Sequence, residues 1–215
     1  MNNITTPTFA MPRWVFVGLI SLLTLTVFNP AHAAENYNIE VIVFENYTQK
    51  AWTEEVWPAD VEQPSTQNSV SLSQIGSAPL GIGQAPKNLT QVVSKMSGSQ
   101  GYKILFHQAW SQTAGNSSKS PSVIINAPAQ TGSQLNGTVK LYKTRFAHVA
   151  VDLTLDKIIP TRIRDDFARH QKISANLLPT HWRFNLKDAR KIKPGELHYI
   201  DHPQFGVLVQ ITPKS

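Results

Sequence analysis

The 215-residue chain has no cysteine. Disulfide bridges are therefore impossible, and thiol proteases, disulfide isomerases and transpeptidases with a cysteine nucleophile are excluded. A lipid-modified N-terminal cysteine is excluded for the same reason. A domain of this length can bury an apolar core without disulfides, so their absence is compatible with a secreted protein.

Several catalytic signatures are absent as well. The sequence has no H-E-x-x-H zinc motif, no S-x-x-K acylation motif and no G-x-S-x-G nucleophile elbow. A glycoside hydrolase needs two placed carboxylates, whereas the acidic residues here are scattered in ordinary contexts. A Ser/His/Asp triad has no sequence signature of its own, and nothing marks one. We therefore expect a protein that is not an enzyme and that has no cofactor.

Long apolar runs are missing, with one exception near the N-terminus. The run Trp14–Phe28 has 15 residues, which is short for a membrane span of about 20. Arg13 precedes it, and residues 29–33, NPAHA, end in an A-x-A cleavage pattern, as in secretory signal peptides. We predict a cleaved signal peptide at 1–33, with a retained anchor as the alternative. The single domain of residues 34–215 is then expected in a bacterial periplasm, without a membrane span.

The excess of positive charge is small. Arg13 is the only charged residue of the predicted signal peptide, so the rest keeps 19 Lys and Arg against 14 Asp and Glu, a net charge of +5. Nucleic acid is not expected as a partner of a secreted protein. A mildly basic surface suits anionic cell-wall material or lipid headgroups, but ordinary solvated charge explains so small an excess equally well.

Strand-like patterns occupy most of the chain. Tyr37–Phe44 is rich in β-branched and aromatic residues, and its continuous apolar end predicts a central strand covered on both faces. Thr138–Asp156 alternates without an interrupting Gly, Pro or Asn, which predicts one long bent strand, with a tight hairpin as the alternative. Trp182–Leu186 alternates as well. Gly101–Trp110 predicts a strand of which one face carries Tyr102, Ile104, Phe106, Gln108 and Trp110.

A short helix is expected between the first two strands. Its apolar residues fall at i, i+3, i+4 and i+7, namely Leu89, Val92, Val93 and Met96. Asn88 is placed as its N-cap and Gly98 as its stop. Residues 162–170 are charged, which predicts a surface loop or a single helical turn. Loop-rich insertions are expected near 63–86, which has no charged residue, and near 111–134.

These elements predict an α+β fold. We expect a mainly antiparallel β-sheet of five to seven strands, with one principal helix packed on a face. The strand–helix–strand order at the start of the domain would allow one additional parallel pair of strands.

Residues 195–211, GELHYIDHPQFGVLVQI, carry residue types that bind metals, among them His198, Asp201 and His202. A catalytic zinc site needs three protein ligands and a base, so another ligand would have to come from elsewhere. The segment also has many residues that break helices, namely Pro194, Gly195, Pro203 and Gly206. We therefore expect no metal.

A β-hairpin over residues 196–206 is the preferred interpretation of this segment. Asp201 could cap the turn by accepting a backbone N–H, and Gly206 could take a positive φ. Val207, Val209 and Ile211 then alternate back into a strand. The hairpin is predicted to be mainly architectural, with ligand contacts made by its exposed edge.

Four blocks together resemble the CsiV family of periplasmic peptidoglycan-binding proteins. They are YNIEVIVFEN with a following EVWP, then GYKILFHQAWSQ, GTVKLYKTRFAHVAVDL and ELHYIDHPQFGVLVQI. The resemblance covers nearly all of the chain after residue 33 and keeps the order of the blocks. Where paired arginines are expected before the last hairpin, this chain has Ala189-Arg190-Lys191, which keeps the positive charge but not a pair of bidentate guanidinium groups.

The resemblance implies a non-enzymatic role in cell-wall integrity and cell shape. The implied partners are peptidoglycan and an outer-membrane lipoprotein that activates a class A penicillin-binding protein. A protein-interaction adaptor without wall binding and a cryptic wall hydrolase are the alternatives.

Aromatic rings stack on sugar faces, and cations pair with the carboxylates of stem peptides. Residues of suitable type are Trp110, Tyr142, Arg145, His148, His198 and Tyr199. Structural roles are the competing interpretation, with Trp110 in the core and His148 hydrogen-bonded within a strand.

Overall fold

The computed structural model describes residues 35–75, 81–96, 98–128 and 132–214. The predicted signal peptide therefore lies outside the described residues. The described chain belongs to one compact unit, residues 34–215. Among the described residues, we find no helix with the length and apolar character needed to cross a membrane.

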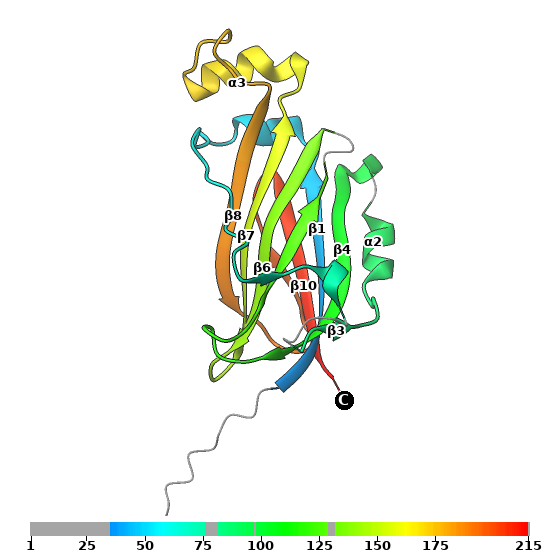
Figure 1. Ribbon diagram of the computed structural model, residues 1–215. Helices are drawn as coiled ribbons and strands as arrows, with labels where there is room; N and C mark the ends of the chain where they lie inside the picture. Colours follow the sequence, from blue (N-terminus) through cyan, green and yellow to red (C-terminus); the bar gives the residue numbers. More distant parts are fainter. Residues whose placement is uncertain (1–34, 76–80, 97, 129–131, 215) are drawn as a thin grey trace, which may run out of the picture. The chain divides into compact units, whose positions relative to one another are not determined.

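The described strands form two five-stranded sheets, here called sheet A and sheet B (Figure 1). In spatial order, sheet A consists of β3 (Gly83–Gln84), β4 (Tyr102–Ala114), β1 (Glu35–Asn46), β10 (Phe205–Pro213) and β9 (Leu197–Ile200). Sheet B consists of β2 (Ser69–Val70), β5 (Ser122–Ala127), β6 (Ser133–Lys143), β7 (Ala147–Ile158) and β8 (His181–Lys191). All neighbouring strands are antiparallel except β2 and β5.

The mainly antiparallel α+β architecture is confirmed, but the predicted number of five to seven strands is wrong. Ten strands are described, in two sheets rather than one. β2 and β3 have two residues each, too few to show any alternation in the sequence. The additional parallel pair that the strand–helix–strand order would allow is not formed, because β1 and β4 are antiparallel.

The described helices are short. They are η1 (Gln49–Thr53), η2 (Leu72–Gln74), α2 (Thr90–Lys95), η3 (Gly98–Gln100), η4 (Thr161–Ile163) and α3 (Arg164–Gln171). The predicted helix exists as α2, but it has six residues and buries none of them. Asn88 is not its cap; instead the carboxylate of Glu40 accepts the backbone N–H groups of Asn88 and Leu89 at 2.6 and 3.0 Å.

The helix that reaches the core is α3, which the sequence predicted as a loop or a single turn. It has eight residues and buries Phe167 completely. The Phe167 ring meets Trp52 and Trp182 edge to face at 5.2 and 5.1 Å between centroids. Most residues of α3 are charged or polar, so its few buried residues do not give a clear helical pattern in the sequence.

β1 is the central strand of sheet A, as predicted, with β4 on one side and β10 on the other. Val41 and Val43 are buried between the sheets, whereas Ile42 and Phe44 are buried on the outer face. A continuous apolar run was the correct sign of a strand covered on both faces.

A β-bulge interrupts the predicted face of β4. Val43 pairs with Phe106 but Phe44 pairs with Ile104, so Leu105 is the extra residue. The alternation reverses at this point. Trp110 therefore packs in the core between the sheets, whereas Tyr102 lies on the outer face of sheet A beside Phe44.

The segment Thr138–Asp156 is a hairpin, not one long strand. β6 ends at Lys143 and β7 begins at Ala147, with Tyr142 paired to His148 across the turn. The backbone N–H of Thr144 donates to the carbonyl of Phe146 at 3.0 Å. The hairpin alternative was correct, and it was not preferred because the turn residues Thr144, Arg145 and Phe146 include none of the usual turn formers.

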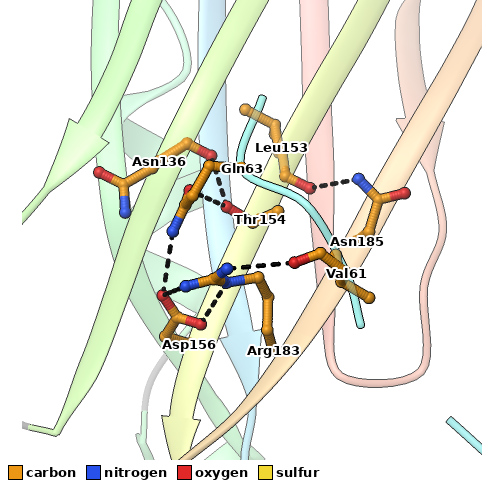
Figure 2. A network of polar contacts seen from close by, with 8 residues as sticks. All are labelled: Val61, Gln63, Asn136, Leu153, Thr154, Asp156, Arg183 and Asn185. Atoms are coloured by element: carbon orange, nitrogen blue, oxygen red, sulfur yellow. Dashed lines mark hydrogen bonds and ion pairs between the residues drawn. The ribbon is translucent and has the colours of Figure 1, made fainter. Parts of the chain in front are cut away.

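Residues 55–65, here called the crossing segment, lie over sheet B. Figure 2 shows how polar side chains of β7 and β8 hold it. The hydroxyl of Thr154 donates to the side-chain oxygen of Gln63 at 2.9 Å, and Arg183 donates to the carbonyl of Val61 at 3.1 Å. Asp156 holds the Arg183 guanidinium in place at 2.7 Å. The segment has no regular secondary structure, and these bonds hold it together with the buried Trp57, whose backbone N–H donates to the side chain of Gln171 at 2.9 Å.

Candidate functional site

Three of the predicted ligand-binding residues meet at the β6–β7 hairpin. Tyr142 and His148 are directly paired across the two strands, and their rings stack at 5.1 Å with planes 12° apart. His148 Nδ1 lies 2.8 Å from the carbonyl oxygen of Phe146 in the turn. Arg145 is exposed in the same turn. The hairpin therefore presents an aromatic pair beside a cation.

The turn also carries an exposed ring that the sequence did not single out. Phe146 keeps 43% of its surface exposed. The ammonium of Lys191 lies 3.4 Å from the centre of this ring, and the guanidinium carbon of Arg145 lies 5.4 Å from it. Lys191 reaches this position because β8 pairs it with His148. Both cations are within the range of cation–π attraction.

These residues line a cavity of about 290 Å³, here called the basic hairpin pocket. It is lined by Tyr37, Lys143, Arg145, Phe146, Ala147, Lys191, Ile192, Lys193 and Pro194. Lys143 pairs with Glu35, and Lys193 pairs with Glu196 at 3.1 Å. Arg145 and Lys191 have no carboxylate partner in the part of the chain that the structure describes. Two cations are thus available to an anionic ligand.

His198 adjoins this pocket through Lys193. Its Nε2 atom accepts the backbone N–H of Lys193 at 3.0 Å. This bond requires an unprotonated Nε2 and fixes the turn between β8 and β9. His198 therefore positions one wall of the pocket and is not free to coordinate a metal with that nitrogen.

The remaining two predicted residues lie elsewhere. Trp110 is 0% exposed, and its indole N–H donates to Gln112 at 2.7 Å, so the side chain offers no surface to a ligand. Tyr199 is exposed on the outer face of sheet A, where its ring stacks on Phe44 at 6.0 Å. Tyr142 and His148 are thus brought together on this hairpin, whereas Arg145 is the only one of the six predicted residues that lines the basic hairpin pocket.

The histidines of the last hairpin do not converge on a common point. Asp201 accepts the hydroxyl of Tyr199, not a backbone N–H as predicted. The turn N–H of Gln204 instead donates to Nδ1 of His202 at 3.1 Å. Across the described residues, no group of three or more His, Asp or Glu side chains is arranged to hold a metal ion.

Gly206 has a different role from the one predicted. Its φ is not positive. A Cβ atom at this position would lie 2.6 Å from the Phe44 ring and 2.7 Å from the Tyr199 ring. Glycine is needed here because two aromatic rings lie directly over the backbone.

A larger cavity of about 780 Å³ lies beside the crossing segment. Its acidic residues are Glu55, Glu62, Asp152 and Asp201, and its basic residues are Arg183 and Lys187. Arg183 is bound to Asp156 as Figure 2 shows, and Lys187 pairs with Asp152 at 3.1 Å. An excess of carboxylates with both cations paired makes this groove less suited to an anionic ligand than the basic hairpin pocket.

The comparison with protein families agrees with the resemblance in the sequence. The family model described as "Peptidoglycan-binding protein, CsiV" matches residues 15–214. The chain belongs to the CsiV family. No curated protein and no solved structure matches it. For a CsiV-family protein, the family description makes peptidoglycan the expected ligand, and the basic hairpin pocket is a described cavity in which two cations without a carboxylate partner flank an exposed ring.

The sequence does not mark Phe146 and Lys191 as site residues, for different reasons. Phe146 was hidden because its turn was predicted to lie inside a continuous strand. In the sequence, Lys191 stands out only as part of Ala189-Arg190-Lys191, which departs from an expected arginine pair. The structure separates these two cations: Arg190 pairs with Asp188, whereas Lys191 lies over Phe146.

Proposed function

We propose that this protein is a non-enzymatic, periplasmic peptidoglycan-binding protein and that the basic hairpin pocket contacts the carboxylates of the stem peptides. The observation that supports this most directly is the pair Arg145 and Lys191, which flank the exposed Phe146 ring without a carboxylate partner among the described residues. Stem peptides carry carboxylates, and charge-assisted hydrogen bonds to them are stronger than neutral ones. The ring adds apolar contact with the methyl and methylene groups of the same peptide.

The test is a pull-down of purified protein with purified sacculi. We expect the double variant Arg145→Ala, Lys191→Ala to bind about tenfold more weakly, which corresponds to about 1.4 kcal/mol. A matched control removes two exposed lysines outside the pocket, Lys50→Ala and Lys87→Ala, and should bind like the wild-type protein. Equal loss in both double variants would mean that only net charge matters and that the pocket is not the site.

The absence of catalysis is tested on the same material. Zymograms with embedded sacculi should show no clearing, with or without a chelator. Clearing that the chelator abolishes would overturn the non-enzymatic part of the proposal and favour a wall hydrolase.

The finer part of the proposal concerns cell-wall synthesis and cell shape. By resemblance to the CsiV family, the wall-bound protein would act through an outer-membrane lipoprotein that activates a class A penicillin-binding protein. Site-specific photo-crosslinking in the periplasm, followed by identification of the linked protein, tests this. Crosslinking to the lipoprotein by a variant that no longer binds sacculi would favour an adaptor whose wall contact is incidental.

A further inference from the structure

Three aromatic rings form a row on the outer face of sheet A. Phe44 on β1 meets Tyr102 on β4 edge to face at 5.3 Å and stacks with Tyr199 on β9 at 6.0 Å. We call Tyr102, Phe44 and Tyr199 the aromatic shelf. The rings come from three strands, so the pairing of sheet A and not a local motif brings them together.

Two local features of the backbone create this shelf. The bulge at Leu105 turns Tyr102 to the outer face, whereas uninterrupted alternation would place it on the same side as the buried Trp110. Gly206 on β10 leaves the space that the rings of Phe44 and Tyr199 occupy, because a Cβ there would collide with both. Any other residue at this position would separate the two rings.

The shelf is open to ligands at both ends. Tyr102 keeps 37% and Tyr199 keeps 47% of its surface exposed, while Phe44 is buried between them. Exposed tyrosines with a buried supporting ring have fixed orientations, so little conformational entropy is lost when a flat ligand packs on them. The shelf is therefore a preformed surface for a flat ligand with an apolar face.

A carboxylate supplies the polar contact beside the rings. The hydroxyl of Tyr199 donates to Oδ1 of the exposed Asp201, and a carboxylate has further lone pairs for other donors. Burial, together with the hydrogen bond and the charge of Asp201, raises the pKa of Tyr199, so this hydroxyl stays protonated. Sugar hydroxyls and N-acetyl N–H groups are donors of the kind that Asp201 can accept.

We propose that the aromatic shelf binds the glycan strand of peptidoglycan, with N-acetylated sugar rings packed on Tyr199 and Tyr102 and a polar sugar group donating to Asp201. This inference rests on the proposed function and adds a second contact between the protein and peptidoglycan. The basic hairpin pocket suits carboxylates, whereas the shelf has rings and an acceptor and suits neutral sugars. A polymer with both groups is the ligand that fits both surfaces.

The test uses a glycan without peptide, the hexasaccharide of N-acetylglucosamine, titrated by calorimetry. We expect binding to the wild-type protein and a loss of about tenfold or more in Tyr199→Ala and in Tyr102→Ala. Tyr199→Phe keeps the ring and should lose less. Tyr47→Ala is the matched control, because Tyr47 is 49% exposed and is not part of the shelf. Melting curves check that each variant is folded.

The outcomes separate this inference from the proposed function. If the wild-type protein does not bind the hexasaccharide, or if Tyr47→Ala weakens binding as much as Tyr199→Ala, the shelf is not a sugar site. Sacculus binding that still depends on Arg145 and Lys191 would then leave the proposed function in place. If the protein binds the hexasaccharide through Tyr199 but its sacculus binding is unchanged in Arg145→Ala, Lys191→Ala, the shelf is a sugar site and the basic hairpin pocket is not a wall-binding site.

Discussion

His202 is packed among aromatic rings although it stands next to an exposed turn. Its ring centre lies 4.9 Å from that of Phe205 and 5.3 Å from that of Trp57. Burial lowers the pKa of His202 to about 4; Lys157 lowers it further, and Asp201 opposes the shift. Nδ1 must also stay unprotonated to accept the N–H of Gln204. A neutral imidazole is thus part of the folded structure.

This predicts a loss of stability in acid. Above pH 6.5 His202 is neutral in both the folded and the unfolded chain, so its contribution is complete. As the pH falls from 6.5 to about 4, the unfolded chain takes up the proton first, which destabilises the folded state by about 3 kcal/mol in all. Urea unfolding across this range should show a shallower pH dependence in His202→Gln. The control His181→Gln, at an exposed histidine, should keep the wild-type slope; equal slopes in all three proteins would contradict the prediction.

Lys157 and Glu45 form a buried ion pair at 3.1 Å. Lys157 also donates to the carbonyl of Asn46 and the side chain of Gln204, both at 2.9 Å. Burial lowers the pKa of Lys157, whereas the charge of Glu45 raises it. Such a pair adds little net stability, but removal of one partner leaves an uncompensated charge in the interior.

We expect Lys157→Met to lower the free energy of unfolding by about 3 kcal/mol, the lower end of the usual range. The lower end applies because Lys103 faces Glu45 from the neighbouring strand and remains as a cation. The double variant Glu45→Gln, Lys157→Met should regain part of this loss, because it removes the uncompensated carboxylate but leaves Lys103 without a carboxylate opposite it. Lys193→Met, which breaks an exposed pair with Glu196, should change stability by less than about 1 kcal/mol. A double variant as unstable as the single one would mean that packing, not charge, explains the loss.

At the scale of elements, the hairpin of β9 and β10 forms as predicted, but different residues hold its turn. Val207 pairs with Ile200, so the predicted strand pairing is confirmed. The cap is supplied by His202, and Asp201 bonds to Tyr199 instead. Phe205 is fully buried below the turn. The burial of Phe205, more than the hydrogen bonds of the turn, is what anchors the hairpin.

Phe205→Ala is therefore expected to lower the free energy of unfolding by about 3–5 kcal/mol, because it leaves a cavity in the core. Asp201→Ala should cost less than about 1 kcal/mol, since its carboxylate is exposed and bonds only to a side chain. Both values come from urea denaturation. If Asp201→Ala proved as costly as Phe205→Ala, the turn and not the buried ring would hold the hairpin.

Element prediction succeeded for strands without a bulge and failed where a bulge or a turn lies inside an alternating pattern. β1, β8 and β10 follow their sequence patterns closely. In β4, one bulged residue moved Tyr102 to the face opposite Trp110, and nothing in the local sequence marks the bulge. The hairpin turn at residues 144–146 was hidden for a related reason, since it keeps the same residues of β6 and β7 facing the core. Neither the bulge nor the turn is marked by the local sequence, so both depend on how the two sheets pack.

At the scale of the molecule, the sequence predicted the class of the fold but not its layers. Apolar faces on nearly every strand are compatible with one sheet covered by a helix or with two sheets facing each other, and only the total area to be covered distinguishes these. The two α-helices of the described residues are too short to cover a five-stranded sheet, so the second sheet does so. The candidate site could also be predicted only in part. The residue types indicated which side chains could bind a ligand, but Phe146 and Lys191 become neighbours only through the pairing of β7 and β8.

The two proposed contact surfaces predict different responses to salt. Exposed cations are screened over about 8 Å at 0.15 M ionic strength and about 3 Å at 1 M, so contacts made by Arg145 and Lys191 should weaken as salt rises. Ring–sugar packing on Tyr199 should not. Sacculus binding measured over a series of sodium chloride concentrations should therefore fall steeply for the wild-type protein and less steeply for Arg145→Ala, Lys191→Ala. Tyr199→Ala should bind more weakly at every concentration with the wild-type slope. If the slope is unchanged in the double variant, the cations that bind the wall lie outside the basic hairpin pocket.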